Sequence, residues 1–139
     1  MNRALTGFTS TIFAEMSALA LATDSVNLGQ GFPDFDGPQS VLDRARRAIA
    51  EGVNQYPPGP GSAVLRQAIA DHQSRWYGVG LDPDHEVLVT AGATEAIAAT
   101  MLGLLEPGDE VVMLEPYYDS YAAMVSLAGG VRCPVRLEP

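Results

Sequence analysis

The most constraining stretch of this sequence runs from residue 86 to residue 105, where an apolar segment meets a glycine turn and then a helical pattern. Residues 87–89 are apolar without alternation, which predicts a strand buried on both faces. After Gly92, apolar side chains recur at helical spacing, at Ile97, Met101, Leu104 and Leu105. The first amides of such a helix lie at the positive end of its dipole, so we expect an anion site there. The alternative is an ordinary connecting turn, of which α/β proteins contain several.

The segments on either side predict further helices and strands in alternation. Helical patterns cover residues 10–22, 38–52 and 62–77, and another helix passes through Met124 and Val125. Strands are expected over residues 111–114 and 131–137. The resulting β-α-β-α-β order predicts an α/β fold with parallel strands and right-handed crossovers. In the helix over residues 38–52, we expect a buried stripe at Leu42, Ala45 and Ile49.

Two loops and one strand end carry candidate ligand contacts. Residues 29–38 are dense in Gly, Pro and Asp, so Gly31 either brings bare backbone close to a ligand or belongs to a plain connector. Residues 54–61 predict a stiff polyproline-like loop presenting Tyr56, which either packs or reaches a ligand with its hydroxyl. Tyr117 and Tyr118 follow the strand over residues 111–114, at the edge of an open α/β sheet where ligands bind. There they either stack on a flat ring or are ordinary aromatic residues at a strand end.

Composition excludes several classes of function. A length of 139 residues suits one domain, and the net charge of −9 argues against a nucleic-acid surface. The single cysteine and two histidines offer no metal-ligand spacing, and no run of residues is long and apolar enough to span a membrane. We expect a soluble cytoplasmic protein without a metal site. All eight basic residues are arginines, so the 139 residues contain no lysine.

Four motifs occur in order along the chain, at residues 27–34 (NLGQGFPD), 54–56 (NQY), 90–96 (TAGATEA) and 115–121 (EPYYDSY). Together they resemble the N-terminal part of fold-type-I, pyridoxal-phosphate-dependent aminotransferases of classes I and II. The nearest branch contains the kynurenine/methionine and N-succinyldiaminopimelate aminotransferases. The resemblance implies a partial α/β fold of this type, with an N-terminal helix and substrate-side loop over residues 1–37. Residues 38–139 would form the first part of the cofactor-binding large domain.

The resemblance also implies roles in binding the cofactor. Gly92, Ala93 and Thr94 match the turn that holds the phosphate of pyridoxal phosphate, in agreement with the anion site expected from the residues alone. Tyr118 matches the aromatic side chain that stacks on the pyridine ring. Tyr56 matches a tyrosine that reaches the phosphate of the other subunit's cofactor, which implies a homodimer.

On the substrate side, Gly31 matches the backbone that meets the α-carboxylate, and Phe13 sits where the family places an aromatic side chain. The implied reaction transfers an amino group between an amino acid and a 2-oxo acid. The family's Schiff-base lysine lies further along the chain, so no catalytic residue is assigned here and we expect these residues to be an inactive fragment. In the family, the strand over residues 87–89 also pairs with a later segment, so we expect only the other two strands to pair.

Alternative functions stay open at this point. The chain fits a non-catalytic remnant, or a module that binds the cofactor or dimerises. A C–S lyase of the same fold would share these N-terminal motifs. A nucleotide-binding α/β domain would use the same turn for phosphate, but the turn lacks both G-x-G-x-x-G and a P-loop lysine.

Overall fold

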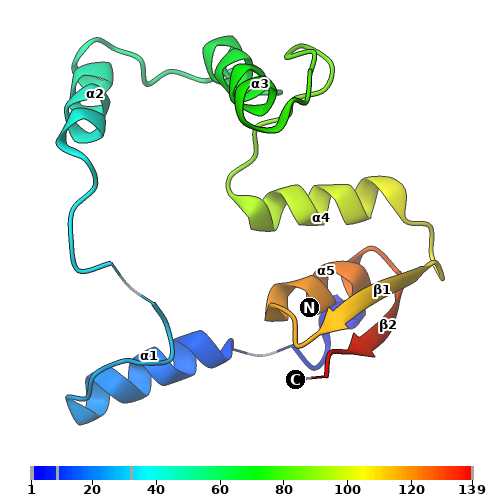
Figure 1. Cartoon of the computed structure of the whole chain (residues 1–139). Coiled ribbons are helices and arrows are strands. Elements are labelled where there is room, and N and C mark those ends of the chain that lie inside the picture. The colour runs from blue at the N-terminus through cyan, green and yellow to red at the C-terminus, as the bar shows by residue number, and fades with distance from the viewer. Residues whose placement is uncertain (1, 9, 32, 139) are drawn as a thin grey trace. The chain divides into compact units, whose positions relative to one another are not determined.

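The computed structural model describes residues 2–8, 10–31 and 33–138, and it divides the chain into two compact units. Unit 1 combines Met1–Thr9 with Gly59–Pro139, and unit 2 comprises Ser10–Pro58. Figure 1 traces the elements in chain order. Among the described residues, no helix combines the length and the apolar character that crossing a membrane requires.

Unit 1 contains a parallel pair of strands joined by a helix. Strand β1 (Glu110–Glu115) pairs with β2 (Val131–Arg136), in a register that begins with Glu110 opposite Val131. Helix α5 (Asp119–Leu127) makes the crossover between them. The rest of the unit contains the short 3-10 helix η1 (Arg3–Leu5) and the helices α3 (Ala63–Tyr77) and α4 (Ala93–Leu104). The predictions that these two strands form and pair with each other are confirmed.

A small apolar core holds α5 against its neighbours. Met113 of β1 and Ala122 and Val125 of α5 are buried in contact with one another, and Val125 is only 1% exposed. Four partly buried side chains pack around this centre: Phe8, Met101, Val111 and Tyr117. Because two strands alone are marginally stable in water, this packing is what supports the sheet. It also holds α5 in contact with α4 (Figure 1).

The segment before α4 is extended but forms no strand, so the prediction of a strand over residues 87–89 is wrong for the described chain. A strand requires a ladder partner, and no described residue supplies one here. The amide of Val89 instead donates to the carbonyl of Pro60 at 3.0 Å. Leu88 is 65% exposed, which contradicts the expectation that both faces are buried.

Unit 2 contains two helices, α1 (Ile12–Thr23) and α2 (Gln39–Ala50). The Thr11 hydroxyl caps α1 by accepting from the amide of Ala14, and Gly52 follows α2 with a φ of +80°. The prediction of a buried stripe on α2 is wrong, since no residue of α2 is buried and Ile49 is 66% exposed. An apolar stripe becomes a core only against a second surface, and the described residues of unit 2 provide none that covers it.

Candidate functional site

The turn that begins α4 has a backbone conformation that only glycine adopts readily. Gly92 is the N-cap of α4, with φ +87° and ψ 170°. Local hydrogen bonds fix the turn: the Gly92 amide donates to the Thr90 carbonyl at 2.8 Å, and the Thr90 hydroxyl donates to the Gly92 carbonyl at 3.0 Å. The carboxylate of Glu95, in the first turn of α4, accepts from the amide of Ala91. Thr90 before the turn and Glu95 after it therefore both fix the conformation of the turn.

The first amides of α4 are left open by this arrangement. Among the described residues, none accepts a hydrogen bond from the amides of Ala93, Thr94 or Glu95. All three residues are exposed, as is Gly92, and a Cβ atom at Gly92 would meet nothing within 4 Å. Unsatisfied amides at the start of a 12-residue helix carry its partial positive charge. This turn can therefore bind an anion such as a phosphate.

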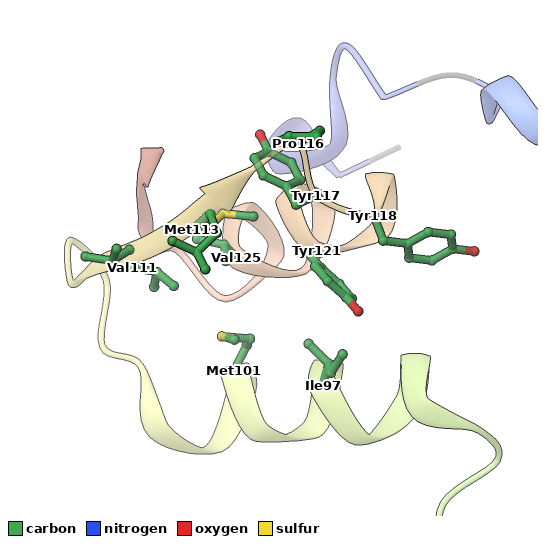
Figure 2. Close-up of a pocket in the computed structure, with 11 residues that line it drawn as sticks. Ile97, Met101, Val111, Met113, Pro116, Tyr117, Tyr118, Tyr121 and Val125 are labelled. Atoms are coloured by element: carbon green, nitrogen blue, oxygen red, sulfur yellow. The ribbon is translucent and has the colours of Figure 1, made fainter. Parts of the chain in front are cut away.

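Aromatic side chains stand at the start of α5. Tyr118 is the N-cap of α5, and its ring meets the ring of Tyr121 edge to face, with centroids 5.7 Å apart. Tyr118 is 46% exposed, which leaves part of its ring accessible to a ligand. Figure 2 shows Tyr118 extending from the start of α5 and Tyr121 pointing toward Ile97 of α4.

A cavity of about 550 Å³ opens between α4, β1 and α5. Its walls are mainly apolar and include both tyrosines, together with Ile97, Met101, Pro116 and Tyr117 (Figure 2). Helices α4 and α5 are in contact, so the turn at Gly92–Thr94 and Tyr118 are presented by two packed helices of one unit. Tyr118 lines this cavity, whereas Gly92, Ala93 and Thr94 are not among its lining residues.

Buried polar atoms lie next to this aromatic pair. Both carboxylate oxygens of Asp119 and the hydroxyl of Ser120 are inaccessible to solvent, and no described residue makes a hydrogen bond with them. A buried carboxylate without a donor is costly, so this position is a local weakness of the isolated chain. Elsewhere in the described residues, no three His, Cys, Asp or Glu side chains are arranged to hold a metal ion.

The remaining predicted site residues, Phe13, Gly31 and Tyr56, belong to unit 2. Tyr56 is 99% exposed. Gly31 is exposed and a Cβ atom there would meet nothing within 4 Å, while Phe13 is half-buried in the first turn of α1. The amide group of Asn27 donates to the Ser17 hydroxyl of α1 at 3.0 Å. This bond ties the loop that leads to Gly31 to the helix that carries Phe13.

Sequence reasoning misses three polar residues that the structure makes conspicuous: Arg66, Glu95 and Asp119. For Glu95 a signal exists, since an acidic residue three positions after a helix N-cap is typical of a capping interaction. For Arg66 the local pattern gives no signal, because its acceptor Pro83 lies 17 residues further along the chain. The local pattern also gives no signal for the inaccessible carboxylate oxygens of Asp119.

Comparison with known proteins agrees with this geometry. Residues 23–139 match the family described as aminotransferase class I and II. The probable N-succinyldiaminopimelate aminotransferase of Mycobacterium tuberculosis is 62% identical over 132 residues, which are 95% of this chain and 33% of that protein. Methionine aminotransferase of Escherichia coli is 48% identical over 130 residues, covering 94% of this chain and 34% of that protein. The chain therefore spans about a third of the length of the curated relatives it matches.

The fold agrees as well. The solved structure of N-succinyldiaminopimelate aminotransferase from Mycobacterium tuberculosis superposes with a TM-score of 0.95 and 60% identity, over 100% of this chain and 36% of that one. Such enzymes have pyridoxal-phosphate fold type I, so the prediction of a partial fold of this type is confirmed. The expected resemblance is confirmed with it, and the chain belongs to the class I and II aminotransferases, a family of pyridoxal-phosphate enzymes.

Proposed function

We propose that the complete protein containing these residues transfers an amino group between an amino acid and a 2-oxo acid, with N-succinyldiaminopimelate as the amino donor. The observation that carries this proposal is the 62% identity to the probable N-succinyldiaminopimelate aminotransferase, sustained over 95% of this chain. The identity to the methionine aminotransferase is lower, at 48%. Methionine is therefore the second donor to compare.

The residues of unit 1 fit pyridoxal phosphate. The three open amides of Ala93, Thr94 and Glu95 would donate to the phosphate, and the Thr94 hydroxyl would add a fourth donor. Gly92 supports this arrangement, because its conformation turns the chain into the helix without placing a side chain over the amides. When bound, pyridoxal phosphate supplies the carbonyl group and the electron sink that amino transfer requires.

Tyr118 would hold the flat ring of the cofactor. Its ring is kept in place by the edge-to-face contact with Tyr121 and by its position as the N-cap of α5. An aromatic face stacked on the pyridine ring orients the ring and keeps water from that side. The apolar wall formed by Ile97 and its neighbours in the cavity would further exclude water from the site.

The substrate contacts and the subunit contact involve unit 2. The exposed backbone at Gly31 would meet the α-carboxylate of the substrate, and Phe13 would line the substrate side. Tyr56, which is 99% exposed, would reach the phosphate bound by the other subunit of a homodimer. We propose that residues 1–37 form the substrate-side segment and residues 38–139 the first part of the large domain.

The chemistry also requires an amine that these residues do not provide. The 139 residues contain no lysine, and a lysine amine forms the covalent link to pyridoxal phosphate and carries the proton in this type of reaction. We propose that the 139 residues alone do not catalyse amino transfer. They would supply the phosphate turn and the stacking ring of the complete enzyme.

The test is an amino-transfer assay on the protein translated from the complete reading frame. N-succinyldiaminopimelate, methionine and kynurenine are supplied in turn as donors with a 2-oxo acid, and the amino acid formed is quantified. We expect the highest kcat/KM for N-succinyldiaminopimelate, and no product from the 139 residues alone. A protein that contains pyridoxal phosphate but gives no product with any donor would refute the proposal.

A further inference from the structure

An arginine is buried in α3, away from the cavity. Arg66 is 8% exposed, although arginine is rarely buried unless its charge is paired. Its guanidinium donates to the carbonyl of Gly61 at 3.3 Å and to the carbonyl of Pro83. It also forms an ion pair with Asp84, at 2.9 Å between Nη1 and Oδ1.

The acceptors of Arg66 come from two segments, one before α3 in the sequence and one after it. Gly61 belongs to the loop before the helix, and Pro83 and Asp84 belong to the turn after it. That turn is itself rigid, because the Asp82 carboxylate accepts from the Asp84 amide at 2.8 Å and the Asp82 amide donates to the Glu86 carboxylate at 2.7 Å. Arg66 therefore ties a preformed turn to the loop before α3.

The same loop holds the segment that leads to the phosphate turn. Val89, three residues before Gly92, donates its amide to the Pro60 carbonyl at 3.0 Å. Gly61 is buried with φ +101°, and a Cβ atom on it would lie 2.6 Å from the Cβ of Val89. The two backbones therefore approach as closely as they do only because residue 61 is glycine. Residues 86–90 have this contact but no strand pairing with the described residues of unit 1.

We propose that Arg66 is a positioning residue for the phosphate turn. Its guanidinium joins the loop at Gly61 to the turn at Asp84, and these two points hold both ends of the segment that delivers Gly92 to the start of α4. The inference rests on the proposed function of that turn, and it adds a residue that touches neither cofactor nor substrate. We call Arg66 together with Gly61, Pro83 and Asp84 the clasp. Loosening the clasp would misalign the open amides of α4 without altering the ring of Tyr118.

The proposal predicts a selective loss of phosphate recognition. Pyridoxal and pyridoxal phosphate share the ring that Tyr118 stacks on and differ in the phosphate. The dissociation constant of pyridoxal divided by that of pyridoxal phosphate therefore measures how much the turn's contacts with the phosphate contribute to binding. We expect Arg66→Gln to lower this ratio about tenfold, the effect of losing one well-placed charge-assisted hydrogen bond. A purely structural role would weaken both ligands alike and leave the ratio unchanged.

The experiment compares the protein with three variants, Arg66→Gln, Asp84→Asn and Arg75→Gln. Asp84 has a side chain that is 69% exposed, so its replacement weakens the clasp without leaving a buried cavity. Arg75 lies exposed on the same helix and is the matched control. For each protein, both dissociation constants are measured, and hydrogen–deuterium exchange is followed in the peptide covering residues 86–92. If Arg66→Gln does not fold, Asp84→Asn decides the question alone.

The inference is supported if the ratio falls in the clasp variants, exchange over residues 86–92 accelerates, and Arg75→Gln matches the parent. It is overturned if a folded clasp variant keeps the parent's ratio. If the parent itself binds pyridoxal as tightly as pyridoxal phosphate, the proposed function of the turn fails, and this inference fails with it. If the parent and every variant bind pyridoxal phosphate more tightly than pyridoxal by the same factor, only the positioning role of Arg66 is refuted.

Discussion

Replacing Gly92 by alanine isolates the contribution of one backbone conformation to the candidate site. The φ of +87° and ψ of 170° lie in a region that is essentially restricted to glycine. No heavy atom lies within 4 Å of the position a Cβ would take, so the substitution adds no collision with a neighbour. Any cost of Gly92→Ala therefore comes from the strained conformation.

The expected magnitude follows from two opposing effects. Holding a non-glycine residue in such a region costs about 1–3 kcal/mol. The lower entropy of alanine in the unfolded chain offsets about 0.4–1 kcal/mol of this. We expect Gly92→Ala to lower the free energy of unfolding by about 1–2 kcal/mol. It should also weaken the binding of pyridoxal phosphate more than the binding of pyridoxal, because the open amides shift.

Gly103 provides a matched control in the same helix. It too has open space at its Cβ position, but it lies inside α4, where alanine is favoured over glycine by about 0.5–1 kcal/mol. Gly103→Ala is therefore expected to raise the free energy of unfolding, opposite in sign to Gly92→Ala. The assay is urea denaturation followed by far-UV circular dichroism. Equal midpoints for the two variants would refute the claim that the turn requires a glycine conformation.

Two further predictions concern unit 1. Gly61→Ala should cost about 3 kcal/mol, from the positive φ and the 2.6 Å approach to Val89, whereas Gly59→Ala meets nothing and should be near neutral in the same assay. Asp82 raises the pKa of the His85 imidazole by accepting a hydrogen bond from it at 2.9 Å. The backbone amide of Asp84 and the His85 ring in turn lower the pKa of Asp82. The stabilisation from this pair is therefore present below the unfolded pKa of His85 and lost as the pH rises through the raised value. It is also lost as the pH falls through the lowered pKa of Asp82. An NMR titration in which Asp82→Asn leaves the pKa of His85 unchanged would contradict the assignment.

Local pattern was sufficient for the parts of the fold whose partners lie within the chain. The strands at β1 and β2 pair with each other, and α5 connects them, so their apolar runs meet a surface within the 139 residues. The Thr11 cap of α1 and the positive φ of Gly52 after α2 depend only on neighbouring residues. The open amides of Ala93, Thr94 and Glu95 likewise follow from the turn and the first residues of α4.

Local pattern failed where a segment needs a distant partner. Residues 87–89 have the composition of a buried strand, but no described strand pairs with them, and Leu88 stays exposed. The sequence of α2 has an apolar stripe, yet Ile49 is 66% exposed because no described residue of unit 2 covers it. Arg66 shows the opposite effect: a charged residue is buried because it contacts one loop before α3 and another after it in the sequence.

The phosphate turn is tested most directly by NMR observation of the backbone amides of Ala93, Thr94 and Glu95 during titration with pyridoxal phosphate and, separately, with pyridoxal. Because these three amides are open at the start of α4, we expect pyridoxal phosphate to shift all three and pyridoxal to leave them nearly unchanged. Amides that stay in place while pyridoxal phosphate binds, or that respond equally to both ligands, would contradict this expectation.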